Sequence, residues 1–230
     1  MLDRSSSRSL FLVALFLLAA ACSTLTDASR FQAGRRALLA DDYESAVAYF
    51  ASVAERRPNY VNVISNYRES VWTYLGRAQY GLKRYPEARR SLEKAVALEK
   101  NDSLARLYLG LTLLRMGELP LGAREVEVGM KGIYDWIEYM NRTQPFQAFW
   151  DPNRQIRKQI DQELAALSSK DFRRESLLND AEWIGKTFEE ELERVRQDER
   201  RQFERDIGDD NGRGQGGRGA ASPRGLHRGT

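Results

Sequence analysis

Cysteine, histidine and proline are scarce in this sequence. Its 230 residues include one cysteine, one histidine and six prolines. One cysteine cannot form a disulfide within the chain, and the sole histidine, His227, cannot supply a cluster of imidazole ligands or a triad in the folded body. The sequence also has no GxxxxGK[ST] phosphate-binding loop. These absences argue against an enzyme, and we expect no catalytic residues, no cofactor and no metal.

The only cysteine, Cys22, follows a short apolar run near the N-terminus. Arg4 and Arg8 come first, residues 10–18 are apolar, and three alanines lead to the cysteine. An apolar run of this length is typical of a signal peptide and is too short to cross a bilayer. The order of basic, apolar and small residues before a cysteine resembles the lipobox of bacterial lipoproteins, although Ala19 stands where that family usually has leucine.

The lipoprotein resemblance implies that residues 1–21 are a signal peptide cut before Cys22. It also implies that the cysteine thiol carries a diacylglycerol and that the new amino terminus carries an acyl group such as palmitate. Several acyl chains would hold the protein stably on a membrane. Ser23 stands in place of the aspartate that retains such proteins in the inner membrane, which implies the outer membrane, facing the periplasm. The alternative is an ordinary secretory signal that leaves a free thiol.

The net charge of +3 comes from the two ends of the chain. Residues 22–207 carry equal numbers of acidic and basic side chains, so the body has no excess of basic charge with which to bind nucleic acid. Glycine and proline are scarce before residue 208, and 30% of all residues are charged, which predicts helices with a large solvent-exposed surface. We therefore expect protein partners and no nucleic acid.

A pattern of small and aromatic residues repeats along residues 31–129. Gly76 and Gly110 are 34 positions apart, a period that is typical of stacked pairs of antiparallel helices. Small residues are needed where paired helices cross closely, and aromatic residues fill the space between pairs. The recurring positions are Gly34, Tyr43, Ala46, Phe50, Val53 and Pro58 in the first unit, Trp72, Leu75, Gly76, Tyr85, Ala88, Leu92 and Ala95 in the second, and Leu109, Gly110 and Gly122 in the third.

These recurring positions resemble the tetratricopeptide repeat (TPR) family. The resemblance implies an all-α fold, with a short TPR solenoid of helix-turn-helix repeats over residues 22–141. Additional helices are expected over residues 142–207, and a disordered tail rich in glycine and arginine over residues 208–230. The alternative is an ordinary helical bundle without repeats.

Eight residues more than one period separate the first unit from the second, within residues 60–70. Apolar side chains continue through this segment at spacings of three and four, among them Val61, Ile64 and Tyr67. Such spacing predicts one long helix over residues 61–82.

Two features follow the repeats. Residues 143–153 contain three aromatic residues, which either cap the end of the solenoid or form a binding patch, and Asp151-Pro152 predicts a helix start with Asp151 as the N-cap. The last predicted helix, residues 172–207, is apolar in its first half and increasingly charged in its second. It either packs its first half on the body and is otherwise solvated, or projects to dock a partner or another copy of the chain.

In TPR proteins the first helix of each repeat lines a concave groove that holds a partner. Arg35 and Arg77 occupy the same position in successive repeats. The resemblance therefore implies a groove with apolar and basic side chains, suited to a segment that carries carboxylates. The alternative is that these arginines are merely solvated. The implied groove residues are Phe31, Arg35, Thr73, Arg77, Tyr80, Leu107, Leu111 and Arg115.

Together these features predict a membrane-anchored periplasmic TPR lipoprotein. It would act as a non-catalytic adaptor between proteins in an assembly, secretion or transport complex of the cell envelope, with the lipidated Cys22 as its anchor. The alternative is an accessory lipoprotein of an uptake system, in which the repeats and the aromatic residues near Trp136 and Trp150 enclose a small ligand.

Overall fold

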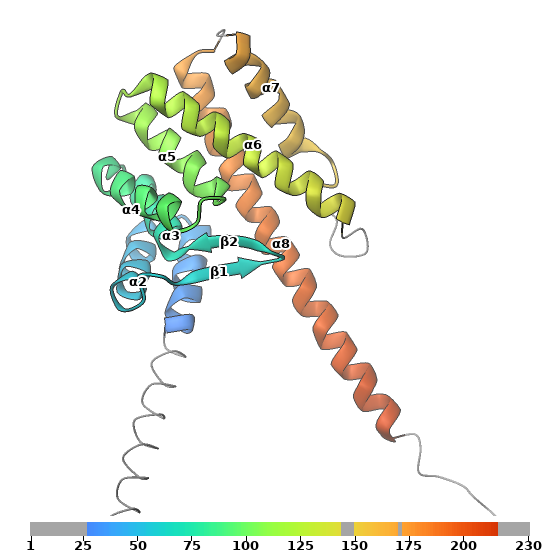
Figure 1. Ribbon diagram of the computed structural model, residues 1–230. Coiled ribbons are helices and arrows are strands. Elements are labelled where there is room, and N and C mark those ends of the chain that lie inside the picture. The colour runs from blue at the N-terminus through green and yellow to red at the C-terminus, as the bar shows by residue number, and fades with distance from the viewer. Residues whose placement is uncertain (1–26, 144–149, 170–171, 216–230) are drawn as a thin grey trace, which may run out of the picture.

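The computed structural model describes residues 27–143, 150–169 and 172–215, which form helices and one two-stranded sheet. The first helix spans residues 27–39. It is followed by α2 (Tyr43–Arg56), β1 (Val61–Ile64), β2 (Tyr67–Ser70), α3 (Val71–Gly81), α4 (Tyr85–Leu98), α5 (Ser103–Arg115), α6 (Leu119–Thr143), α7 (Gln155–Ser169) and α8 (Arg174–Gln215). The predicted all-α TPR solenoid with additional C-terminal helices is confirmed (Figure 1).

The predicted signal peptide and the predicted lipidation site, Cys22, lie outside the described residues. Within the described ranges, no helix combines the length and the apolar character that crossing a bilayer requires.

Glycines allow the paired helices of each repeat to cross closely. A Cβ atom on Gly34 would lie 2.8 Å from the ring of Phe50, and one on Gly76 would lie 2.5 Å from the side chain of Leu92. A Cβ on Gly110 would lie 2.5 Å from a backbone nitrogen of α6. Carbon atoms do not approach this closely without displacing a neighbour. The recurring glycines of the sequence pattern therefore mark the crossing points of three successive helix pairs.

The segment between the first two repeats is a β-hairpin, so the prediction of one long helix over residues 61–82 is wrong. β1 and β2 pair antiparallel with Val61 opposite Ser70 and Ile64 opposite Tyr67. The two turn residues, Ser65 and Asn66, have φ angles of 44° and 69°. A two-residue turn with positive φ at both positions matches the twist of antiparallel strands.

Two local signals oppose the helix in this segment. Asn66 belongs to the few residue types that tolerate positive φ, and β1 is rich in β-branched side chains, which favour strands. Ser70 then begins α3, because its side chain accepts a hydrogen bond from the backbone N–H of Thr73. Apolar spacing alone did not distinguish this hairpin from a helix.

The hairpin joins the repeats to the C-terminal helices. Ile64 and Tyr67 are buried in the same apolar core as residues of α5, α6 and α8. The ring of Tyr67 lies 5.2 Å from that of Trp136 and 5.1 Å from that of Phe188, measured between centroids. The Tyr67 hydroxyl also accepts a hydrogen bond from the N–H of Leu104, at 3.0 Å. The hairpin is therefore part of the core and not a surface loop.

The segment around Asp151 covers one end of this core. Trp150 is 2% exposed and its ring lies 4.5 Å from that of Trp136, so this aromatic residue caps the core, while Phe146 and Phe149 lie outside the described residues. The following helix, α7, starts at Gln155 and not at Pro152 as predicted. Asp151 nevertheless caps it, because its carboxylate accepts hydrogen bonds from the N–H groups of Ile156 and Arg157.

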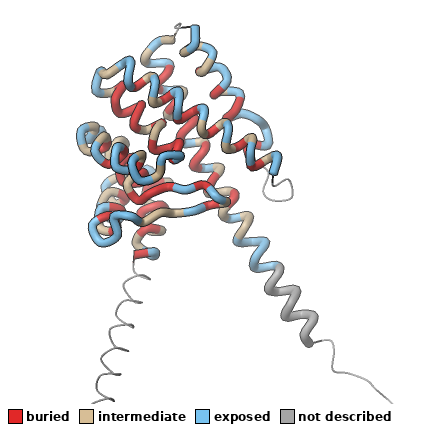
Figure 2. The backbone as a smooth tube through the Cα atoms, viewed as in Figure 1, coloured by how far each residue is buried: buried red, intermediate tan, exposed pale blue. Residues whose placement is uncertain are grey.

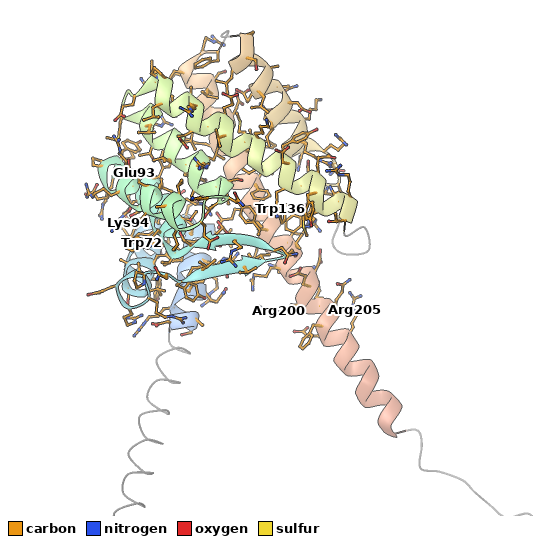
Figure 3. All side chains as sticks on the ribbon, in the orientation of Figure 1. Trp72, Glu93, Lys94, Trp136, Arg200 and Arg205 are labelled. Atoms are coloured by element: carbon orange, nitrogen blue, oxygen red, sulfur yellow. The ribbon has the colours of Figure 1, made fainter. Side chains whose placement is uncertain are left out.

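The last helix, α8, both packs on the body and projects from it (Figure 2). Its N-terminal half packs against α5, α6 and α7. Beyond this half the side chains become exposed, Phe203 is 66% exposed, and Arg200 and Arg205 stand clear of the other helices (Figure 3). The helix continues to Gln215, past the predicted helix end at residue 207, and residues 216–230 lie outside the described part. The buried apolar side chains of α8 are Leu177, Leu178, Ala181, Ile184, Phe188, Leu192 and Val195.

The glycine crossings predict a difference between two matched substitutions. Gly110→Ala should lower the free energy of unfolding by about 1–3 kcal/mol, because the added methyl meets backbone atoms of α6. Gly76→Ala should cost less, since the side chain of Leu92 can rotate away. Urea unfolding followed by circular dichroism measures both. Equal losses would contradict the assignment of Gly110 to a tighter crossing.

Candidate functional site

The first helices of the three repeats, residues 27–39, α3 and α5, form the concave or inner face of the repeats. The N-terminal half of α8 covers this face (Figure 1). Four charged residues of α8 point toward the repeats, namely Glu182, Lys186, Glu189 and Glu193. Their spacings of four, three and four place them on a single face of the helix. The apolar residues of α8 lie on a different face, which packs on α5, α6 and α7. One helix thus holds the C-terminal core on one side and meets the repeats with charges on the other.

Each acidic residue of this face binds an arginine of the repeats. Glu182 pairs with Arg115 at 2.7 Å, and Glu193 pairs with Arg35 at 3.1 Å. Glu189 forms an ion pair with Arg77. Three ion pairs therefore fasten α8 along successive repeats.

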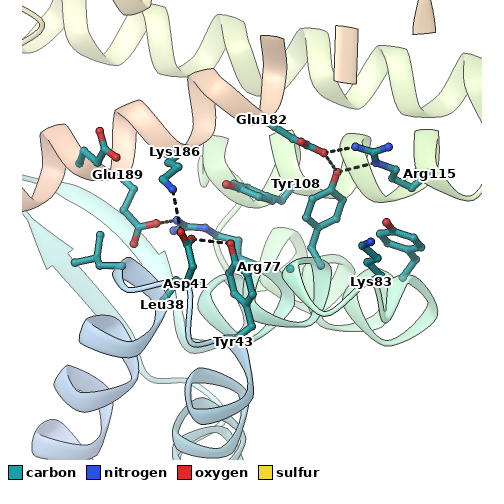
Figure 4. Close-up of a pocket in the computed structure, with 15 residues that line it drawn as sticks. Leu38, Asp41, Tyr43, Arg77, Lys83, Tyr108, Arg115, Glu182, Lys186 and Glu189 are labelled. Atoms are coloured by element: carbon teal, nitrogen blue, oxygen red, sulfur yellow. Dashed lines mark hydrogen bonds and ion pairs between the residues drawn. The ribbon is translucent and has the colours of Figure 1, made fainter. Parts of the chain in front are cut away.

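Two contacts supplement these ion pairs. The hydroxyl of Tyr80 donates a hydrogen bond to Glu182. Lys186 of α8 binds Asp41, in the turn between the first two helices, at 3.2 Å (Figure 4).

Arg77 stands at the centre of this interface. Its side chain is 3% exposed and pairs with two carboxylates, Glu189 of α8 and Glu69 of the hairpin, the second at 3.4 Å. Glu69 also accepts a hydrogen bond from the hydroxyl of Tyr74. Since a buried charge is tolerated only when it is paired, Arg77 requires both the hairpin and α8 to be in place. The Nε atom of Arg77 and one oxygen of Glu189 have no hydrogen-bond partner, so the cluster is not fully satisfied.

Burial and charge shift the pKa values of carboxyl groups near this interface. Burial raises the pKa of Asp102 to about 7, and the negative charge of Glu69 adds to the increase. Burial also raises the pKa of Glu69, although Arg77 opposes the change. Burial would likewise raise the pKa of Glu193, but hydrogen bonds from Arg196 and Gln197 and the charge of Arg35 lower it to about 2.

The structure places the eight predicted groove residues in three environments. Arg35, Arg77, Tyr80 and Arg115 bind side chains of α8. Leu107 and Leu111 are fully buried in the core that α8 completes. The predicted open groove is therefore corrected: α8 covers it, and the arginines bind carboxylates of their own chain.

The remaining two groove residues lie away from α8. Thr73 donates a hydrogen bond to Asp102, the N-cap of α5, at 2.5 Å. Phe31 is fully buried in the core of the first repeat, where its ring lies 5.5 Å from that of Phe50. Both residues have structural roles within the repeats.

A pocket remains between the repeats and α8. Its volume is about 470 Å³, and it is lined by residues from the end of the first helix and the turn at 41–43, the end of α3, the start of α4, the middle and end of α5, and the face of α8 (Figure 4). The small-ligand alternative placed its site elsewhere, near Trp136 and Trp150. Those two rings pack edge to face at 4.5 Å and fill that space themselves.

The acidic face of α8 was not predicted from the sequence to be a partner of the repeats. The signal was present, because Glu182, Glu189 and Glu193 recur with helical spacing opposite the apolar positions of the same helix. It could be read only as a solvated face until the position of α8 was known. In the part of the chain that the structure describes, no group of three or more histidine, cysteine, aspartate or glutamate side chains could hold a metal ion.

Comparison with known families supports the repeat assignment. A family model of the tetratricopeptide repeat matches residues 70–102, which hold α3 with its N-cap Ser70, α4, and Asp102, the N-cap of α5. A comparison with curated proteins finds no match. Repeats of this family are typically non-catalytic modules for protein–protein interaction. The second unit of the sequence pattern is therefore a tetratricopeptide repeat.

Removal of the central arginine should weaken the whole interface. Arg77→Met should lower the free energy of unfolding by about 3–5 kcal/mol, because it leaves Glu69 and Glu189 buried without their cation. Arg106→Met is the matched control, since its ion pair with Glu125 lies closer to the surface and should contribute about 0–1 kcal/mol. Urea denaturation measures both variants. A loss of similar size in the control would show that the buried ion pairs of Arg77 stabilise the fold no more than an ion pair near the surface.

The raised pKa of Asp102 predicts a pH dependence. The group has an ordinary pKa of 3.8 and a folded pKa of about 7. Between about pH 4 and 7 the folded chain holds a proton that the unfolded chain has lost, so the free energy of unfolding should fall as the pH rises. Asp102→Asn should remove this part of the decline, whereas Asp161→Asn, on the exposed face of α7, should leave it unchanged. Identical pH profiles for wild type and Asp102→Asn would refute the assignment.

Proposed function

We propose that this protein is a non-catalytic adaptor, anchored by a lipid on Cys22 to the outer membrane and facing the periplasm, in an envelope assembly, secretion or transport complex. The tetratricopeptide repeat of residues 70–102 is the observation that carries the adaptor role. The order of basic, apolar and small residues before Cys22 supports the anchor.

The arrangement of α8 supports the projecting part of this helix as the partner surface. The concave face is occupied by α8, whose apolar half is part of the core, so a partner cannot take its place without exposing that core. The part of α8 after Val195 projects into solvent and is held as a helix by pairs such as Arg201 with Asp198 at 2.5 Å. A rigid, charged helix that stands away from the body is suited to dock a partner.

The hairpin supports the base of this projecting segment. Ser65, at the hairpin tip, donates a hydrogen bond to Glu199, which lies one turn beyond Val195. The projecting helix thus leaves the body in a defined direction, which favours a specific docking geometry over a flexible tether.

The test combines crosslinking and mass spectrometry on native membranes. We expect acyl mass on the N-terminal peptide that begins at Cys22, and none in a Cys22→Ser chain. We expect the full chain to capture a reproducible set of envelope proteins. A chain that ends at residue 196 keeps all the buried residues of α8 and should fold, but should lose that set.

Arg35→Glu and Arg77→Glu are not useful probes of partner binding, because both side chains are buried against α8. A better probe of partner binding is Phe203→Ser, because it changes only an exposed side chain of the projecting segment. Acyl mass absent from the intact chain would overturn the anchor. An unchanged set of captured proteins after truncation would overturn docking through α8.

A further inference from the structure

The pocket between the repeats and α8 has walls from four sources. The end of the first helix with the turn at residues 41–43 supplies one wall, the end of α3 with the start of α4 supplies a second, α5 supplies a third, and α8 supplies the fourth (Figure 4). Its volume of about 470 Å³ lies within the range of sites that hold small molecules. The pocket does not coincide with the projecting part of α8, so it calls for a role separate from partner docking.

Tyrosines form much of the lining. The ring of Tyr80 lies 5.6 Å from that of Tyr85 and 5.6 Å from that of Tyr108, measured between centroids. Tyr43 faces them from the turn and packs on Gly81, where a Cβ would lie 2.5 Å from its ring. The absence of a side chain at Gly81 therefore lets this ring lie against the end of α3. Four tyrosines from three successive repeats offer flat apolar faces and hydroxyl groups to one space.

The charges of the lining are balanced and mostly paired. Three ion pairs join the pocket walls: Arg77 with Glu189, Arg115 with Glu182, and Lys186 with Asp41. The two other charged lining residues, Lys83 and Glu190, also have opposite signs. An anion or a cation in this space would meet fixed charges of both signs. A purely apolar ligand would cover these polar groups without replacing their contacts with water.

We propose that this pocket binds a small, uncharged, hydroxyl-rich ligand of the mono- or disaccharide class. Each hydroxyl of a sugar both donates and accepts hydrogen bonds, so it can use carboxylates, guanidinium groups and tyrosine hydroxyls in one site. The C–H face of a pyranose ring packs on an aromatic ring. The ion pairs hold their own side chains in place, so the ligand meets polar groups that are already oriented.

The test is direct binding to the full chain, purified in detergent. Saturation-transfer NMR and calorimetry would be run with maltose, lactose and diacetylchitobiose as neutral probes, and with benzoate and trimethylglycine as anionic and zwitterionic ones. We expect at least one disaccharide to bind and neither of the other two probes. Because no partner protein is present, failure here leaves the adaptor role untouched, and loss of partner capture leaves this site untouched.

Substitutions place the binding in the pocket. Tyr85→Ala removes one aromatic wall and should weaken sugar binding by about three- to tenfold. Lys186→Ala removes a 59% exposed member of one ion pair and should weaken it as well. Tyr49→Ala is the matched control, because Tyr49 is 40% exposed on α2 and does not line the pocket. No binding by any sugar, binding of only the charged probes, or equal effects of Tyr85→Ala and Tyr49→Ala would overturn the proposal.

Discussion

The buried guanidinium of Arg77 is the contact on which the rest of the structure depends. It lies on α3, in the middle of the repeats, and pairs with Glu69 of the hairpin and Glu189 of α8. These three residues belong to three parts of the chain that share no secondary structure. A buried arginine without both carboxylates would carry a large desolvation cost. Because this charge must be paired, it joins the repeats, the hairpin and the last helix into one unit.

The hairpin and α8 together convert an open repeat surface into a closed one. Tyr67 of the hairpin packs between Trp136 and Phe188, and the acidic face of α8 neutralises arginines of all three repeats. The apolar face of α8 stabilises this closed arrangement, because displacing the helix would expose residues such as Leu177 and Ile184 to water. The repeats therefore act as a scaffold that holds α8 and leaves its second half free.

This arrangement separates two surfaces with different chemistry. The projecting part of α8 is long, charged and stabilised by its own ion pairs, which suits it to a macromolecular partner. The pocket beneath α8 is small, aromatic and balanced in charge, which suits it to a neutral polar molecule. Lys186 contributes to the pocket from the packed half of the same helix whose other half projects from the body.

The sequence by itself determined the repeat units. Gly34, Gly76 and Gly110 fall at helix crossings because close packing of neighbouring helices depends on residues that are near one another in the chain. The apolar first half of α8 and its charged second half could also be predicted from the sequence, since both follow from periodicity along one helix. The basic character of the inner face was visible in Arg35 and Arg77.

Only the tertiary structure decided that the inner face of the repeats meets α8 and that the segment of residues 60–70 forms a hairpin. Arg35 and Glu193 are 158 residues apart, and no local pattern relates positions at such a distance. The apolar spacing of residues 60–70 fits a helix. A hairpin forms instead, with positive φ angles at Ser65 and Asn66 and with Tyr67 buried against distant rings. Local propensity sets the elements of this protein, whereas the pairing of buried charges and the filling of a shared core set their arrangement.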